Sequence, residues 1–90
     1  MKVGYVLITC ENDLEDNIIG KLKSIKQVTA VHKVLGMYNV IVDIRTDDIE
    51  SLRDVIVWKI KKIDGITSTI SLISHTSDAS IRENILQHAN

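Results

Sequence analysis

The chain contains an internal repeat, and this repeat limits the architectures into which the chain can fold. Residues 23–29, with the sequence KSIKQVT, return at residues 61–67 as KKIDGIT. Upstream of each copy, an acidic-aliphatic-acidic triplet, at residues 13–15 and 48–50, follows an apolar run rich in β-branched residues. Such runs are typical of strands, and the triplets open segments with helical spacing, so each half predicts the order strand, helix, strand.

Two such halves in a chain of 90 residues predict a single domain. Their combined order, βαββαβ, is that of the ferredoxin-like fold, an α+β architecture with a four-stranded antiparallel sheet. The strands are expected at residues 3–10, 28–35, 40–44 and 66–73. No proline and no cluster of glycines marks a linker. We therefore assign residues 1–74 to one ferredoxin-like domain and residues 75–90 to a C-terminal extension with a short helix at 78–89.

Two amphipathic helices are predicted from the spacing of aliphatic residues. The first carries a stripe of apolar residues at intervals of three and four: Leu14, Ile18, Leu22 and Ile25. The stripe of the second consists of Ile49, Leu52, Ile56, Ile60 and Ile63, with Val55 beside it. Gly65 follows this stripe, at a place where a glycine often ends a helix. Trp58 lies two residues from stripe positions, and we expect it at the edge of the core or in an interface.

The two faces of the sheet are assigned by carrying the strand register from one half of the repeat to the other. This places one alternating set beneath the helices: Val6, Ile8, Cys10, Val40, Val42 and Ile44. The other face then contains Tyr5, Leu7, Thr9, Val31, Leu35, Ile41, Thr67, Thr69, Ser71 and Ile73, with Asp43 and Lys33 among them. That face is too apolar to remain in water, which predicts a sheet-to-sheet dimer contact or cover by the C-terminal helix. His32 falls on the helix side, which fits a polar ring only if it is hydrogen-bonded or the strand contains a bulge.

Composition excludes several classes of function. Eleven basic and twelve acidic side chains give a net charge of -1, which disfavours direct binding of nucleic acid. The chain has no phenylalanine, two tyrosines and one tryptophan, so it lacks the aromatic platform of an RNA-binding sheet. The single cysteine, Cys10, excludes a disulfide framework and a cysteine-based zinc site. The N-terminal apolar run meets Glu11 and Asp13 too early for a signal peptide or a membrane span, so a cytoplasmic protein is expected.

The sequence also lacks the motifs of common catalytic sites. Its three histidines have no metal-ligand spacing, so no metal site is expected. No glycine-rich phosphate loop is present, and no cofactor is predicted. A small ferredoxin-like enzyme such as an acylphosphatase would need an anion-binding loop with an arginine, and residues 3–13 supply neither. We therefore predict that the protein is not an enzyme.

Two polar features remain as candidates for a binding site. Residues 36–39, with the sequence GMYN, interrupt two apolar stretches and predict a hairpin turn, because glycine and asparagine tolerate positive φ. The predicted last strand carries a ladder of hydroxyl groups on Thr67, Thr69 and Ser71. Taken separately, each feature has a structural explanation. Together they predict a small polar site near a sheet edge, where loop amides and hydroxyl groups hold a zwitterion.

Three segments of the chain form a combination that resembles a known family. They are YVLIT at residues 5–9, VHKVLGMYN at residues 31–39 and IDGITSTIS at residues 63–71. The combination is similar to the amino-acid effector domain of Lrp/AsnC transcriptional regulators, also called the RAM domain. The resemblance spans residues 3–73, which is nearly the whole chain before the predicted C-terminal helix.

The resemblance implies a ferredoxin-like domain that forms a homodimer through its sheet, with dimers assembling further, commonly into an octamer. It implies that a small-molecule amino acid binds in clefts between dimers, against the glycine-containing loop and nearby strand residues. The corresponding ligand-binding residues of this sequence are Gly36, Met37, Tyr38, Asn39, Thr69 and Ser71. Regulators of this family carry an N-terminal helix-turn-helix domain, whereas this chain begins at the first strand. The resemblance therefore implies a stand-alone effector module that acts through full-length regulators.

Two positions of the loop depart from the pattern of the family. The family usually has aspartate where this chain has Asn39, and often a polar or acidic residue where it has Met37. A charged contact to the amino group of a ligand is then missing. The leading hypothesis is an oligomeric amino-acid-binding module that modulates transcription. The alternative is a ligand-free oligomeric protein-interaction module with a degenerate pocket.

Overall fold

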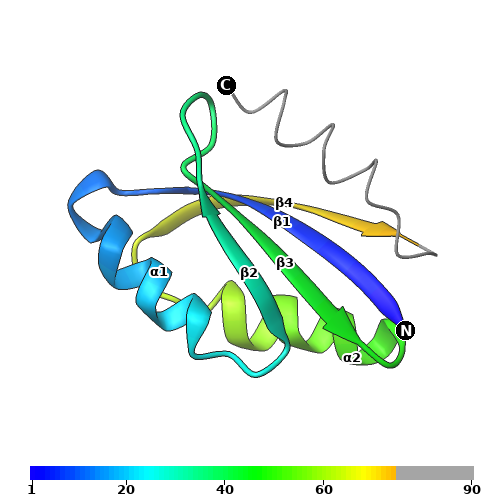
Figure 1. The fold of residues 1–90 in the computed structure, drawn as a ribbon. Coiled ribbons are helices and arrows are strands. Elements are labelled where there is room, and N and C mark those ends of the chain that lie inside the picture. Colours follow the sequence, from blue (N-terminus) through cyan, green and yellow to red (C-terminus); the bar gives the residue numbers. More distant parts are fainter. Residues whose placement is uncertain (75–90) are drawn as a thin grey trace.

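The computed structural model describes residues 1–74, and the predicted helix at 78–89 and extension at 75–90 lie outside the described residues. The described chain runs, in order, through β1 Lys2–Cys10, η1 Asn12–Leu14, α1 Glu15–Lys23, β2 Val28–Lys33, β3 Val40–Thr46, α2 Ile49–Asp54, η2 Val55–Ile60 and β4 Ile66–Ser74. This is the predicted order βαββαβ (Figure 1). Within these residues, no helix is long and apolar enough to cross a membrane.

The four strands form one antiparallel sheet in the order β2-β3-β1-β4. The first strand is central, because Val6 of β1 pairs with Val42 of β3 on one side and with Ser71 of β4 on the other. Both helices lie on the same face of the sheet (Figure 1). The arrangement confirms the predicted α+β, ferredoxin-like fold.

The core lies between the two helices and the face of the sheet that they cover. Residues of both predicted helical stripes contribute to this core. Its buried members are Val6, Ile8, Cys10, Ile18, Leu22, Val40, Val42, Ile44, Leu52, Val55, Ile56 and Ile60. Leu14, Ile25 and Ile63 are partly buried against them. The helix-side faces predicted for β1 and β3 are therefore confirmed. A fully buried aliphatic side chain contributes about 1.5–3 kcal/mol relative to its exposed state, so this cluster supplies the main stabilising term.

The second helix begins at a side-chain cap and ends in a wider turn. Asp48 is the N-cap, and its Oδ1 accepts a hydrogen bond of 2.7 Å from the Ser51 backbone N–H. This bond favours the carboxylate form and lowers the pKa of Asp48. After Asp54 the chain continues as the π-helical segment η2, which was not predicted from the sequence. The segment turns Val55, Ile56 and Ile60 inward and leaves Val57 and Trp58 exposed.

A bulge in β2 corrects the predicted faces of three residues. The pairing of β2 with β3 shifts register between Val28 and Ala30, after which Val31 pairs with Val42 and His32 with Ile41. Paired residues share a face of the sheet, so Val31 and Lys33 lie on the helix side and their predicted place on the other face is wrong. The bulge moves His32 to the opposite face, where its Nε2 lies 3.5 Å from Asp43 Oδ2.

A second irregularity corrects the predicted faces of β4. Thr69, Ser71 and Ile73 pair with Ile8, Val6 and Gly4, which places them on the helix side of the edge strand. Their predicted place on the opposite face is therefore wrong. The register shifts between Thr9 and Cys10, because Cys10 pairs with Ile66 and the intervening Thr67 has no partner in the register. The Thr67 hydroxyl instead donates to the Thr9 carbonyl over 3.0 Å.

The face opposite the helices is nevertheless apolar, as predicted. Val3, Tyr5 and Ile41 are buried there, and the pairing of β1 with β4 adds Ile70 and Leu72, both exposed. Leu35, which was predicted to continue β2 on this face, instead lies beyond the end of β2 at Lys33.

Candidate functional site

An open hollow of about 590 Å³ lies between the start of α1 and the loop that joins β2 to β3. Ten residues line it: Asn12, Asp13, Glu15, Asp16, Lys33, Val34, Leu35, Gly36, Tyr38 and Asn39. Both walls are placed by the fold, because β1 leads directly into η1 and α1 while β2 returns beside that helix. The loop itself projects beyond the sheet (Figure 1).

The loop is closed by backbone hydrogen bonds on both sides of Gly36. The Val34 N–H donates to the Asn39 carbonyl over 3.0 Å, and the Asn39 N–H donates to the Ile8 carbonyl over 2.8 Å. Gly36 has a φ of 137°, a conformation that side-chain-bearing residues rarely adopt. The predicted turn is therefore present, and Gly36 occupies the position where glycine is needed.

Asn39 joins this loop to the end of β1 through its side chain. Its Oδ1 accepts a hydrogen bond of 2.8 Å from the Cys10 N–H, two residues beyond Ile8, which forms the last β1–β3 pair with Val40. The carboxamide thus replaces a backbone carbonyl where the ladder ends. Asn39 holds the wall of the hollow in place, a role that the sequence did not indicate.

Asn39→Ala is expected to lower the free energy of unfolding by about 1–3 kcal/mol, because the Cys10 N–H loses its acceptor beside a buried side chain. Asn39→Asp retains an oxygen at this position and serves as the control. Urea denaturation of both variants at one protein concentration checks this. Equal stability of the alanine variant and the wild type would show that the Asn39 carboxamide does not stabilise the fold.

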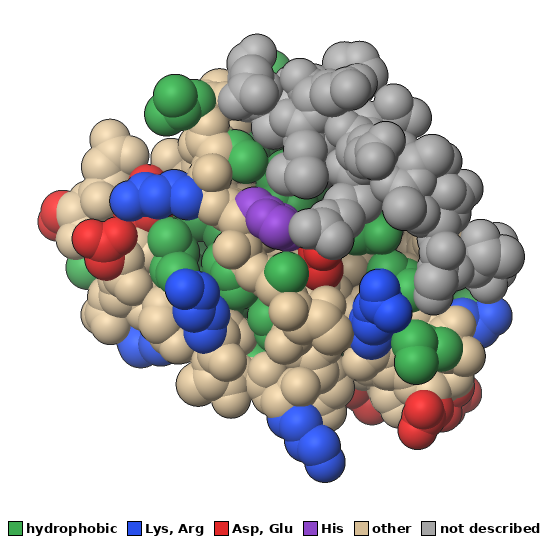
Figure 2. All heavy atoms as spheres, in the orientation of Figure 1, with side chains coloured by type: hydrophobic (Ala, Val, Ile, Leu, Met, Phe, Trp, Pro, Cys, Tyr) green, Lys and Arg blue, Asp and Glu red, His purple; other side chains and the backbone are tan. Residues whose placement is uncertain are grey.

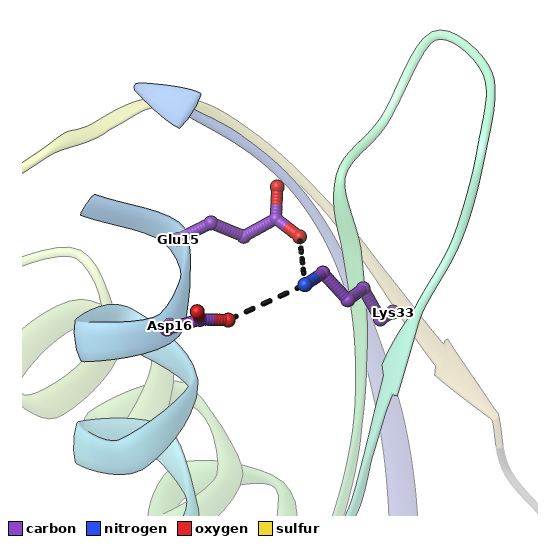
Figure 3. A network of polar contacts seen from close by, with 3 residues as sticks. All are labelled: Glu15, Asp16 and Lys33. Atoms are coloured by element: carbon purple, nitrogen blue, oxygen red, sulfur yellow. Dashed lines mark hydrogen bonds and ion pairs between the residues drawn. The ribbon is translucent and has the colours of Figure 1, made fainter. Parts of the chain in front are cut away.

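The charged groups of the hollow meet at the start of α1. Lys33 Nζ lies 3.3 Å from Asp16 Oδ1 and 3.4 Å from Glu15 Oε1, so one ammonium bridges two carboxylates (Figure 3). The hydrogen bond to Asp16, and then that to Glu15, raises the pKa of Lys33. The Glu15 side chain is only 15% exposed, whereas that of Asp16 is open to solvent. With Asp13, the hollow presents three carboxylates and one ammonium group.

The structure brings together only some of the six residues predicted to bind ligand. Gly36, Tyr38 and Asn39 line the hollow, whereas Met37 belongs to the same loop, is 85% exposed and does not line it. Thr69 and Ser71 lie on β4, which is separated from β2 by two strands. Thr69 lines a separate hollow of about 220 Å³ with Lys61, Ile66, Thr67 and Ser68. A single chain does not unite all six residues, and their joint role stays a prediction.

The sequence reasoning missed the acidic wall and Lys33. Asp13 and Glu15 were part of the repeated triplet, but their partner, Lys33, was expected on the far face of the sheet. The bulge in β2 turns Lys33 toward α1, and a bulge leaves no reliable mark in a single sequence. The order of the elements could have indicated this contact. In a strand-helix-strand unit, the start of the helix and the end of the second strand lie at the same end of the sheet, here the start of α1 and the end of β2.

Redox and metal chemistry find no support in the described residues. Burial raises the pKa of the Cys10 thiol, with a smaller contribution from the Glu15 and Glu11 carboxylates, which disfavours the reactive thiolate. Within residues 1–74, no three His, Cys, Asp or Glu side chains are grouped as a metal site would need.

The chain is similar to known regulatory proteins in sequence. It matches the family model of the Lrp/AsnC ligand binding domain over residues 3–77. It is 32% identical over 80 residues to the regulatory protein AsnC of Haemophilus influenzae, and this match covers 81% of the chain and 53% of that protein. The chain thus spans about half the length of this curated relative.

Solved structures share the fold over most of the chain. TTHA0845 from Thermus thermophilus has a TM-score of 0.81 at 26% identity, over 87% of this chain and 98% of that one. The transcriptional regulator NMB0573 from Neisseria meningitidis, solved as a complex with L-methionine, has a TM-score of 0.75 at 8% identity. That match covers 84% of this chain and 51% of the regulator, and an identity this low indicates the fold alone.

Proposed function

Because the chain belongs to the family of Lrp/AsnC ligand-binding domains, we propose that it binds a free amino acid and thereby modulates transcription regulators in the cytoplasm. The family membership and the predicted resemblance agree. Its members are ligand-binding domains of regulators, so the prediction that the protein is not an enzyme is confirmed.

The mixed charge of the hollow is the observation that carries this proposal. An amino acid needs a cation for its carboxylate and an anion for its ammonium group, and both signs lie along the start of α1. The ligand carboxylate would compete with Asp16 for Lys33, and its ammonium would bind near Asp13. The Tyr38 side chain provides an aromatic wall with one polar end. A concave site with a few convergent polar groups is the usual form of a small-molecule site.

Assembly is part of the same proposal. The apolar face opposite the helices, with Ile70 and Leu72 exposed at its edge, fits a homodimer formed sheet to sheet. Thr69 and Ser71 would then contribute to a ligand cleft from a neighbouring dimer of a larger ring, such as an octamer. Full-length regulators of the same family are the proposed partners through which it acts.

Thermal shifts against a panel of amino acids at millimolar concentration test ligand binding. A ligand at about 100 times its dissociation constant adds roughly 2.7 kcal/mol to the stability of the folded state. The panel includes L-methionine. We expect a rise in melting temperature with one chemical class of amino acid, and the loss of this rise in Tyr38→Ala. Glu50→Ala, an exposed change on α2, is the control and should respond as the wild type does.

The alternative function, a ligand-free interaction module, is favoured by one feature of the hollow. Lys33 is already paired with Glu15 and Asp16, and the Asn39 oxygen is already used by Cys10. A panel without any shift, together with an intact oligomer in light scattering, would support this alternative. A monomer at all concentrations would contradict both functions, because each depends on assembly.

A further inference from the structure

The charged side chains that line the hollow do not balance one another. Asp13, Glu15 and Asp16 supply three carboxylates and Lys33 supplies one ammonium group, so the lining carries a net charge of -2. Figure 2 shows acidic side chains over the start of α1, with a basic side chain among them. A neutral amino acid is a zwitterion and leaves this excess negative charge in place. The hollow therefore favours a ligand with an additional positive charge.

The two carboxylates that hold Lys33 differ in how easily a ligand can replace them. Glu15 Oε1 lies 3.4 Å from Lys33 Nζ, and the Glu15 side chain is only 15% exposed. Asp16 Oδ1 lies 3.3 Å from the same atom, but the Asp16 side chain is 91% exposed. An ion pair in such an exposed position contributes little to stability. A ligand carboxylate can therefore displace Asp16 from Lys33 more readily than it can displace Glu15.

The loop side of the hollow provides an apolar path beside these charges. Val34, Leu35 and Tyr38 line this side, and Gly36 adds no side chain to it. The volume of about 590 Å³ lies within the range of small-molecule sites, about 300–1,000 Å³. A straight chain of methylene groups packs well along such a surface while a charge at its end stays in a polar setting. The hollow thus has room for a long side chain that ends in a charged group.

We propose that this hollow selects amino acids with a cationic side chain, such as lysine and ornithine. The ligand carboxylate takes the place of Asp16 at Lys33, and the α-ammonium group binds Asp13. The released Asp16 carboxylate then binds the side-chain ammonium group, while the methylene chain lies along Tyr38. The inference rests on the proposed function, because it names the class of ligand for the same site.

Calorimetric titration with matched ligands tests this selectivity. L-Norleucine has the same straight carbon chain as L-lysine and lacks only the side-chain ammonium group. We expect L-lysine to bind at least about fivefold more tightly, which is the contribution of one partly exposed ion pair. Cadaverine, which is lysine without its carboxylate, should bind more weakly than lysine because it has no group for Lys33. Norleucine binding as tight as that of lysine would overturn the proposal.

Asp16→Asn tests the role of the displaced carboxylate. Lysine loses the partner of its side-chain ammonium group, whereas norleucine loses nothing and no longer competes with Asp16 for Lys33. The ratio of the two dissociation constants should therefore fall at least about fivefold, toward one. Asp54→Asn makes the same change at an exposed position of α2 and should leave the ratio as in the wild type. An equal loss of affinity for both ligands would mean that Asp16 serves only the start of α1, and would overturn the pairing.

This inference and the proposed function fail in distinguishable ways. If the folded protein binds no amino acid of the panel, both are rejected. If it binds neutral amino acids as tightly as lysine, the selectivity is rejected and amino-acid binding stands. A preference for lysine that shrinks as the salt concentration rises would support the charge argument, because exposed charges are screened by salt. A preference that salt does not change would overturn it.

Discussion

Gly65→Ala is expected to lower the free energy of unfolding by about 2–4 kcal/mol, through backbone strain and overpacking together. Gly65 has a φ of 97°, which disfavours any residue with a Cβ. A Cβ at this position would lie 2.8 Å from Leu14 Cδ1 and 3.1 Å from Ile18 Cδ1, at the start of α1. The Gly65 carbonyl also accepts from the Glu11 N–H over 3.0 Å, so a backbone shift there would disturb the entry to α1.

Urea denaturation followed by circular dichroism, at one fixed protein concentration, measures this loss. Gly20→Ala is the matched control, because Gly20 lies within α1 and its added Cβ would meet nothing within 4 Å apart from its chain neighbours and the backbone of the helix itself. We expect the control to gain about 0.4–1 kcal/mol from the higher helix propensity of alanine. Equal responses of the two variants would show that neither strain nor contact at Gly65 matters.

Leu52→Ala is expected to cost about 2–5 kcal/mol, the range for deletion of a buried leucine side chain that leaves a cavity. Leu52 is fully buried and packs over the central strand at Gly4. A Cβ at Gly4 would lie 2.9 Å and 3.1 Å from the two methyl carbons of Leu52, so the glycine makes room for the leucine. Arg53→Ala, at the neighbouring exposed position, should change stability by no more than about 0.5 kcal/mol.

A double variant tests whether Leu52 and Gly4 are coupled. Gly4→Ala alone should destabilise by about 1–3 kcal/mol, because it crowds the Leu52 side chain. In the Leu52→Ala background the same methyl group enters the cavity and should cost much less. Strict additivity of the two losses would mean that the two residues do not compete for the same space.

Most of the fold was predictable because its signals are local and repeated. Leu22 and Ile60 lie on stripes with helical spacing, and alternation along β1 correctly placed Val6 and Ile8 under the helices. The face of β4 was not predictable by carrying over the repeat. Thr67 is inserted in the ladder between the pairs Thr9–Ser68 and Cys10–Ile66, and one inserted residue exchanges the faces of everything beyond it. The two halves of the repeat therefore share the same order of secondary-structure elements, but equivalent residues do not always lie on the same face of the sheet.

The candidate site was predictable only where a turn signal marked it. Gly36 and Asn39 predicted the loop, because both residue types tolerate positive φ. In the structure Asn39 has negative φ and stabilises the loop through its side chain instead. The opposite wall depends on a contact between Lys33 and Glu15, which are far apart in sequence. Such a contact depends on the register of β2, and that register depends on the bulge between Val28 and Ala30.

The central place of β1 has a consequence for how the chain is made. The ribosome synthesises β1 before the other strands. One edge of β1 stays without its pairing strand until β4 is made, because Val3 pairs with Ser74 and Tyr5 with Leu72. Closure of so long a loop is slow compared with the formation of helices and hairpins. Until then, the newborn chain exposes an apolar strand with an unpaired edge, which is the kind of segment that aggregates or recruits chaperones. We therefore expect overproduction in cells to be limited by the interval between the synthesis of the first and the fourth strand, even where the finished domain is stable.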